Sequence, residues 1–126
     1  MTVVVDTSVL VDHLRGDARA RKVLLAARED GDDLAASVLT RTELLAGVRS
    51  RERRELEALF TVLRWVDVDR EIADRAGGLA NRYLASHRDI DTVDYVIAAT
   101  AEALGAHLLT KNVKHFPMIA GLRPPY

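Results

Sequence analysis

Three acidic residues, Asp6, Glu43 and Asp94, have the type and surroundings to perform chemistry if the fold brings them together. Asp6 stands between the apolar runs VVV and VLV, where a charge is costly unless it is paired. Two carboxylates about 4 Å apart repel each other by roughly 4 kcal/mol at an effective dielectric constant of about 20, and a divalent cation removes that cost. We therefore expect these acids to hold Mg²⁺ or Mn²⁺, which would polarise a phosphoryl oxygen and activate an attacking water.

Short strands that alternate with amphipathic helices must position these acids. β-Branched or small apolar runs predict strands, and apolar residues three to four positions apart predict helices, several of which end at a glycine. The alternation predicts a single domain over residues 1–126 with a three-layer α/β/α fold, whose central, mainly parallel sheet has four to five strands. The expected strands are 2–6, 33–37, 66–69 and 106–112, and the expected helices are 8–16, 18–31, 39–48, 51–65, 71–87 and 92–105. The proline-containing tail over 116–126 is expected to be irregular, with at most one short strand.

The acids all fall where such a sheet binds ligands, outside the carboxyl ends of its strands. Asp6 ends the first strand, Glu43 lies in the first turn of the helix after the second strand, and Asp94 lies in the first turn of the helix before the last one. We expect Thr40 to be the N-cap of the helix that carries Glu43, and Asp91 or the threonine after it to be the N-cap for Asp94. Capping alone would also explain two of the acids, because Thr40-x-x-Glu43 matches a capping box and Asp91-x-x-Asp94 resembles one.

Three stretches, VVVDTSVLVDHL, SVLTRTELLAGV and DYVIAATAEALGAHLLTKNVKHF, resemble the PIN domain, and among PIN proteins the VapC toxins of bacterial toxin–antitoxin pairs. The resemblance covers almost the whole chain. It implies a metal-dependent endoribonuclease that cuts structured RNA, often tRNA or rRNA, and that forms a homodimer and binds a cognate antitoxin. It also implies that Asp6, Glu43 and Asp94 are the metal-binding, catalytic acids, and that Ser8, or Thr7, is the catalytic hydroxyl beside the first acid. That hydroxyl would bond the carboxylate or a metal-bound water, and it could also cap the first helix.

The sequence departs from the family pattern at its fourth acid. Many members have an acid where this chain has Asn112, or in a DF pair where it has His115-Phe116. Asn112 could accept a hydrogen bond from a metal-bound water, and His115 could contact phosphate or move a proton. A turn-forming asparagine and a surface histidine explain them equally well. Asp91, one helical turn before Asp94, is another candidate for the missing carboxylate.

Substrate binding must depend on local charge, because the formal net charge of the chain is −1. Lys111 and Lys114 lie beside the proposed metal site and Arg41 comes two residues before Glu43, so we expect these three to contact phosphates. The denser arginine run over 49–54 is interleaved with glutamates and favours a solvated helix face.

The rest of the composition narrows the location and the class of function. The chain has no cysteine, and no apolar stretch approaches the roughly 18 residues of a membrane span. No leader pattern precedes the first strand, so we expect a cytoplasmic protein that does not enter a membrane. The main alternative to a ribonuclease is a catalytically weak PIN-like module that binds nucleic acid and regulates expression together with its antitoxin. A receiver-like or phosphatase domain is a weaker alternative, because Glu43 and Asp94 fit it poorly.

Overall fold

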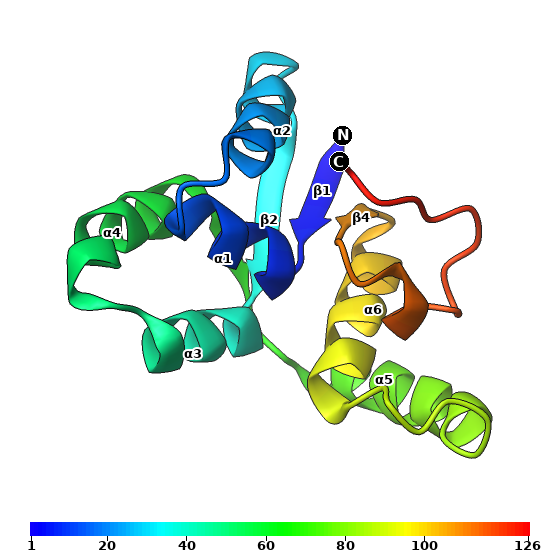
Figure 1. Ribbon diagram of the computed structural model, residues 1–126. Coiled ribbons are helices and arrows are strands. Elements are labelled where there is room, and N and C mark those ends of the chain that lie inside the picture. Colours follow the sequence, from blue (N-terminus) through cyan, green and yellow to red (C-terminus); the bar gives the residue numbers. More distant parts are fainter.

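A parallel sheet of four strands, in the order β3-β2-β1-β4, forms the centre of the molecule (Figure 1). The computed structural model describes residues 1–126. The strands are β1 (Thr2–Val5), β2 (Asp33–Ser37), β3 (Arg64–Val66) and β4 (His107–Leu109). Because β1 lies inside the sheet, the residues that follow it come between the ends of two neighbouring strands.

Helices cover both faces of this sheet and bury a separate apolar cluster on each. Along β1, Val4 packs into one cluster while Val3 and Val5 pack into the other, since successive side chains of a strand point to opposite faces. One face is covered by α1 (Thr7–Leu14), α2 (Ala18–Glu29), α3 (Val38–Gly47) and α4 (Arg53–Val62), and the other by α5 (Arg70–Tyr83) and α6 (Thr92–Leu104). This arrangement confirms the three-layer α/β/α prediction. None of the helices is long and apolar enough to cross a lipid bilayer.

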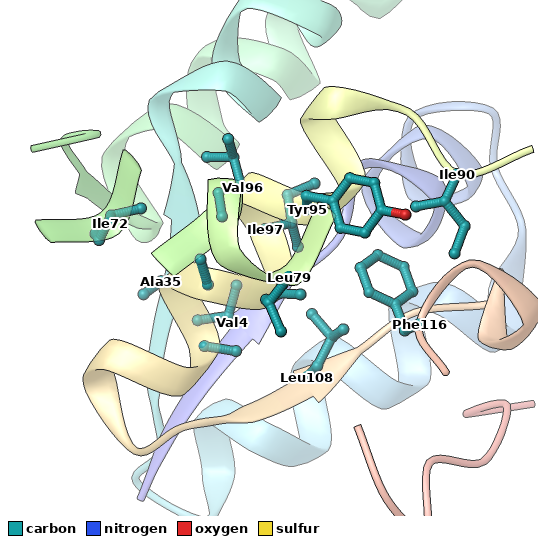
Figure 2. Close-up of a cluster of buried hydrophobic side chains, with 14 residues drawn as sticks. Val4, Ala35, Ile72, Leu79, Ile90, Tyr95, Val96, Ile97, Leu108 and Phe116 are labelled. Atoms are coloured by element: carbon teal, nitrogen blue, oxygen red, sulfur yellow. The ribbon is translucent and has the colours of Figure 1, made fainter. Parts of the chain in front are cut away.

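The segment after β4 is anchored to the second of these faces by one aromatic side chain. Phe116 is 1% exposed and packs in the cluster formed with α5 and α6, where Figure 2 shows its ring beside Tyr95 and Ile90. A short 3₁₀ helix, η2 (Val113–His115), precedes it. Because Phe116 is fixed in the core, His115 and the residues between it and β4 are held close to the end of the sheet.

Three local predictions differ from the structure. β3 spans 64–66 rather than 66–69, because Asp69 is the N-cap of α5 and accepts a hydrogen bond from Ile72 N at 2.8 Å. The helix expected over 51–65 is divided into the 3₁₀ helix η1 (Ser50–Glu52) and α4. The strand expected over 106–112 ends at Leu109, and η2 follows it, whereas the tail after His115 is irregular as predicted. The glycine stop of α6 is confirmed, since Gly105 has a φ of 59° in the left-handed region.

Candidate active site

A polar cleft of about 370 Å³ opens at the carboxyl ends of β1 and β4. Helices α1, α3 and α6 and the segment after β4 each contribute side chains to it, so it lies where the sheet topology predicts a ligand site. Its lining residues are Asp6, Thr7, Ser8, Val11, Asp12, Glu43, Asp91, Asp94, Lys111, Asn112 and His115. The cleft thus brings together the three acids predicted from the sequence, both hydroxyls and all of the auxiliary residues.

Asp6 is a buried carboxylate with one oxygen fixed and the other unbonded. Asp6 is 3% exposed, and its backbone N donates a hydrogen bond to Leu109 O on β4. Oδ2 accepts hydrogen bonds from Ser8 Oγ at 2.8 Å and from Thr110 Oγ1 at 2.7 Å. These two hydrogen bonds fix the orientation of the carboxylate. Both side-chain hydrogen bonds to Asp6 end on Oδ2, which leaves Oδ1 unbonded, and Asp6 lines the cleft.

Glu43 lies in the second turn of α3, one turn later than predicted. The N-cap of α3 is Ser37, whose Oγ accepts a hydrogen bond from Leu39 N, so the predicted capping box starting at Thr40 is wrong. Thr40 is instead a fully buried residue inside the helix. Thr7 Oγ1 lies 2.7 Å from Glu43 Oε1 and 3.1 Å from Thr40 Oγ1, so α1 and α3 together orient the Glu43 carboxylate.

Asp91 and Asp94 cap α6 and line the cleft at the same time. Asp94 N donates to Asp91 Oδ1 at 2.9 Å and Asp91 N donates to Asp94 Oδ2 at 3.4 Å, which confirms the predicted capping box. Burial, and then the negative charge of Asp91, raise the pKa of Asp94 to about 6. His115 Nδ1 lies 3.1 Å from Asp94 Oδ2, and its Nε2 lies 3.7 Å from Asp89 Oδ2. His115 is therefore directed at an acid of the cleft.

The donor set fits a hard divalent cation that keeps part of its water shell. No three histidine or acidic side chains are close enough together to share one metal ion. Mg²⁺ needs only one or two protein carboxylates, and its remaining ligands are waters and substrate oxygens. The unbonded Oδ1 of Asp6 and the carboxylate of Asp94, whose raised pKa a nearby cation would lower, are the two donors that best meet this need.

Two residues of the cleft region were missed from the sequence. Thr110 is fully buried, donates to Asp6 Oδ2 and accepts a hydrogen bond from Asn112 N at 3.0 Å. It follows β4, and the pairing of Val5 with Leu109 sets it opposite Asp6, so only the strand order could have revealed it. Asp12 contacts Lys111 and is four residues after Ser8, which places both on one face of α1.

The three predicted phosphate ligands have different positions. Lys111 lines the cleft, whereas Arg41 and Lys114 do not. The Arg41 guanidinium lies over the ring of Phe60, 3.9 Å from its centroid, and 5.1 Å from the centroid of the Trp65 ring. Two residues along a helix correspond to a rotation of about 200°, so Arg41 must face away from Glu43. The expectation that Arg41 binds substrate in this cleft is therefore corrected.

Comparisons with known proteins agree with this geometry. The PIN domain model matches residues 3–122. The chain is 52% identical to "Ribonuclease VapC19" of Mycobacterium tuberculosis over 122 residues, which cover 97% of this chain and 98% of the relative. It is 46% identical to "Ribonuclease VapC10" of the same organism over 124 residues, which cover 98% and 92% of the two chains.

Solved structures share the fold over nearly the whole chain. A toxin–antitoxin complex from Klebsiella pneumoniae contains a chain with a TM-score of 0.81 and 28% identity, with 98% of each chain covered. VapBC-1 from nontypeable Haemophilus influenzae matches with a TM-score of 0.77 and 26% identity, covering 98% of this chain and 96% of the other. The family model, the relatives and the solved structures agree, and they show that the chain belongs to the PIN domain family and to its VapC group.

Proposed function

We propose that this protein is a Mg²⁺-dependent endoribonuclease and the toxin of a toxin–antitoxin pair, neutralised by a cognate antitoxin. The observation that carries the proposal is the Asp6 carboxylate, which is buried at a strand end, fixed through one oxygen by two hydroxyls and open to an acidic cleft through the other. The relatives are named as ribonucleases and the similar structures are toxin–antitoxin complexes, which supports the same assignment.

Each cleft residue has a role that follows from its contacts. Asp6 and Asp94 would hold Mg²⁺ directly, with Mn²⁺ as a substitute, and Glu43 would act on it through a bound water. The ion would supply a Lewis acid and a water of lowered pKa. Ser8 fixes the orientation of the Asp6 carboxylate through its hydrogen bond to Oδ2, and Thr7 does the same for Glu43. These two hydroxyls therefore set the geometry in which a scissile phosphate would be received.

The remaining cleft residues would act on the substrate and on the cation. Asp91 adds negative charge beside Asp94 and so strengthens the attraction for a cation. Asn112 and His115 stand where the resemblance to the PIN family implies a fourth acid. His115 Nδ1, 3.1 Å from Asp94 Oδ2, would contact that carboxylate or a phosphate, and Asn112 offers an amide to a bound water. Lys111 is the lysine of the cleft and would contact a phosphate of the RNA, whether tRNA or rRNA.

We assign the surface for a partner protein to an apolar cavity outside the acidic cleft. An apolar cavity of about 170 Å³ lies between α2 and α4, beside the exposed side chains of Leu25 and Val62. An antitoxin segment, or a second copy of the chain in a homodimer, could cover such side chains. Growth arrest on expression of the protein alone, relieved when its cognate antitoxin is co-expressed, would support the toxin assignment. Unimpaired growth would contradict it.

A catalytically weak nucleic-acid-binding module is the second candidate, and one observation favours it. The acids of the cleft are held by separate protein hydrogen bonds and do not converge on one point. Purified protein incubated with total RNA in Mg²⁺ or in EDTA separates the two candidates. The Asp6→Asn variant tests the proposed metal site, and Asp74→Asn, an exposed acid on α5, is its matched control.

The ribonuclease proposal requires cleavage in Mg²⁺ that stops in EDTA and in Asp6→Asn but persists in Asp74→Asn. Equal cleavage in EDTA, or cleavage that survives the Asp6 substitution, would show that the activity does not come from this site. Retained RNA binding without any cleavage would favour the binding module.

A further inference from the structure

Lys111 is tied to helix α1 through both its backbone and its side chain. Its backbone N donates to Ser8 Oγ over 3.2 Å, and its Nζ contacts Asp12 Oδ2 over 2.6 Å. Ser8 and Asp12 lie on the same face of α1, because they are four residues apart. The ammonium group of Lys111 is therefore held at Asp12, one helical turn along α1 from the Ser8 hydroxyl that fixes Asp6.

The same oxygen of Asp12 also accepts a hydrogen bond from Tyr126, at the end of the tail. Tyr126 Oη donates to Asp12 Oδ2 over 2.7 Å, and the Arg19 guanidinium lies 5.1 Å from the centroid of the Tyr126 ring. Burial, and then the hydrogen bond to Asp12, raise the pKa of the Tyr126 phenol, so that it remains a protonated donor at neutral pH. Asp12 thus has one cationic and one neutral donor on a single oxygen.

Charge in the cleft makes this pairing important for substrate entry. Lys111 is the one lysine or arginine among the lining residues, which include four other acids besides Asp12. While Lys111 is paired with Asp12, its charge is neutralised and a phosphate meets mainly carboxylates. The Lys111 side chain is 38% exposed and that of Asp12 is 19% exposed, so the ammonium is the more accessible partner.

We propose that Lys111 changes partner when RNA enters the cleft, leaving Asp12 for a phosphate of the RNA strand, while Tyr126 stabilises the carboxylate left behind. A largely buried carboxylate that loses its cation is costly unless another donor remains, and Tyr126 is that donor. Tyr126 is therefore a positioning residue that does not touch the RNA but sets how readily Lys111 is released. This inference rests on the proposed ribonuclease function, because RNA supplies the phosphate.

Binding of a short, fluorescein-labelled single-stranded RNA tests the exchange. Anisotropy is measured in EDTA, which prevents metal-dependent cleavage, and over a range of salt concentrations. We expect Tyr126→Phe to raise the Kd by about 5- to 10-fold, since Asp12 without the phenol has no donor left when Lys111 departs and so retains Lys111 more strongly. Lys111→Ala should weaken binding and reduce the slope of log Kd against log salt by about 0.7, the value for one phosphate contact on a single strand.

Double variants distinguish partner exchange from a general structural effect. Asp12→Asn should lower the Kd, because the amide no longer competes with phosphate for Lys111. Tyr126→Phe should then have no further effect in the Asp12→Asn or the Lys111→Ala background. Tyr83→Phe and Lys22→Ala, whose side chains lie outside the cleft, are the matched controls, and thermal unfolding of each variant reports its folding.

The outcomes separate this inference from the function it rests on. Mg²⁺-dependent cleavage by the wild type with an unchanged Kd for Tyr126→Phe would overturn the exchange and leave the ribonuclease intact. An effect of Tyr126→Phe that persists in the Lys111→Ala background would also overturn it. RNA binding that depends on Tyr126 and Lys111 without any cleavage would support the exchange and overturn the ribonuclease. Absence of both binding and cleavage would overturn both.

Discussion

Replacing Asp94 with asparagine should stabilise the metal-free protein at neutral pH while abolishing its response to Mg²⁺. The pKa of Asp94 is raised to about 6 from its ordinary value of 3.8, chiefly by burial and then by Asp91. At 1.36 kcal/mol for each pH unit, that difference corresponds to about 3 kcal/mol. Partial solvent access lowers this figure, and we expect a gain of about 1–1.5 kcal/mol at pH 7.

The sign of the pH dependence follows from proton binding. Between pH 4 and 6, the folded state holds a proton on Asp94 that the unfolded state has lost, so ionisation of Asp94 destabilises the fold as the pH rises. The Asp94→Asn variant has no carboxyl group to ionise at this position, so it does not lose this stability as the pH rises. The variant should therefore unfold about 3–5 °C above the wild type at pH 7.5, and by a smaller margin at pH 4.5.

Thermal unfolding followed by circular dichroism in EDTA measures both differences, and repetition in Mg²⁺ measures cation binding. Mg²⁺ should raise the Tm of the wild type and leave that of Asp94→Asn almost unchanged, because a ligand stabilises only the state that binds it. Asp74→Asn is the matched control and should behave as the wild type. A Tm of Asp94→Asn that lies below that of the wild type at pH 7.5 would refute the reasoning.

Three other substitutions test contacts of the site and the fold. Thr110→Val should lower the rate of Mg²⁺-dependent cleavage by about 10- to 100-fold, because Thr110 supports the proposed metal ligand Asp6. An unchanged rate would mean that Ser8 alone orients Asp6. Gly105→Ala should cost about 1 kcal/mol in a urea titration because of the positive φ, with cleavage unaffected; unaltered stability would argue against the left-handed cap. Arg41→Ala should change the fluorescence of Trp65, the one tryptophan, because the guanidinium lies over its ring. The KM for RNA should not change, and a raised KM would show that Arg41 is a substrate ligand after all.

Local patterns were sufficient to predict the elements and three of the acids. Asp6 stands out because three β-branched residues lead a buried strand directly to it, and the Asp91-x-x-Asp94 box is contained within one helical turn. Thr40 was misassigned as a cap because Ser37, three residues earlier, is an equally good one. β2 ends at Ser37, so the helix begins directly after it and Ser37, not Thr40, is the N-cap. The residue pattern of the helix does not show where that strand ends.

The remaining contacts depend on strand order and on the path of the tail. Thr110 meets Asp6 only because β4 is the neighbour of β1, and Asp12 meets Tyr126 across almost the full length of the chain. Arg41 illustrates the opposite error, since proximity in sequence to Glu43 becomes separation around a helix. Composition and periodicity specify none of these pairings.

The acids that border the cleft belong to different layers of the molecule. Glu43 is carried by α3, which packs on one face of the sheet, whereas Asp94 is carried by α6 on the other, and Asp6 ends the strand between them. A cation bound by Asp6 and Asp94, and reached by Glu43 through a water, would connect two separately packed halves. Small sliding movements of the helices would then open or close the metal site, and loading with metal would make the two halves unfold as a single unit.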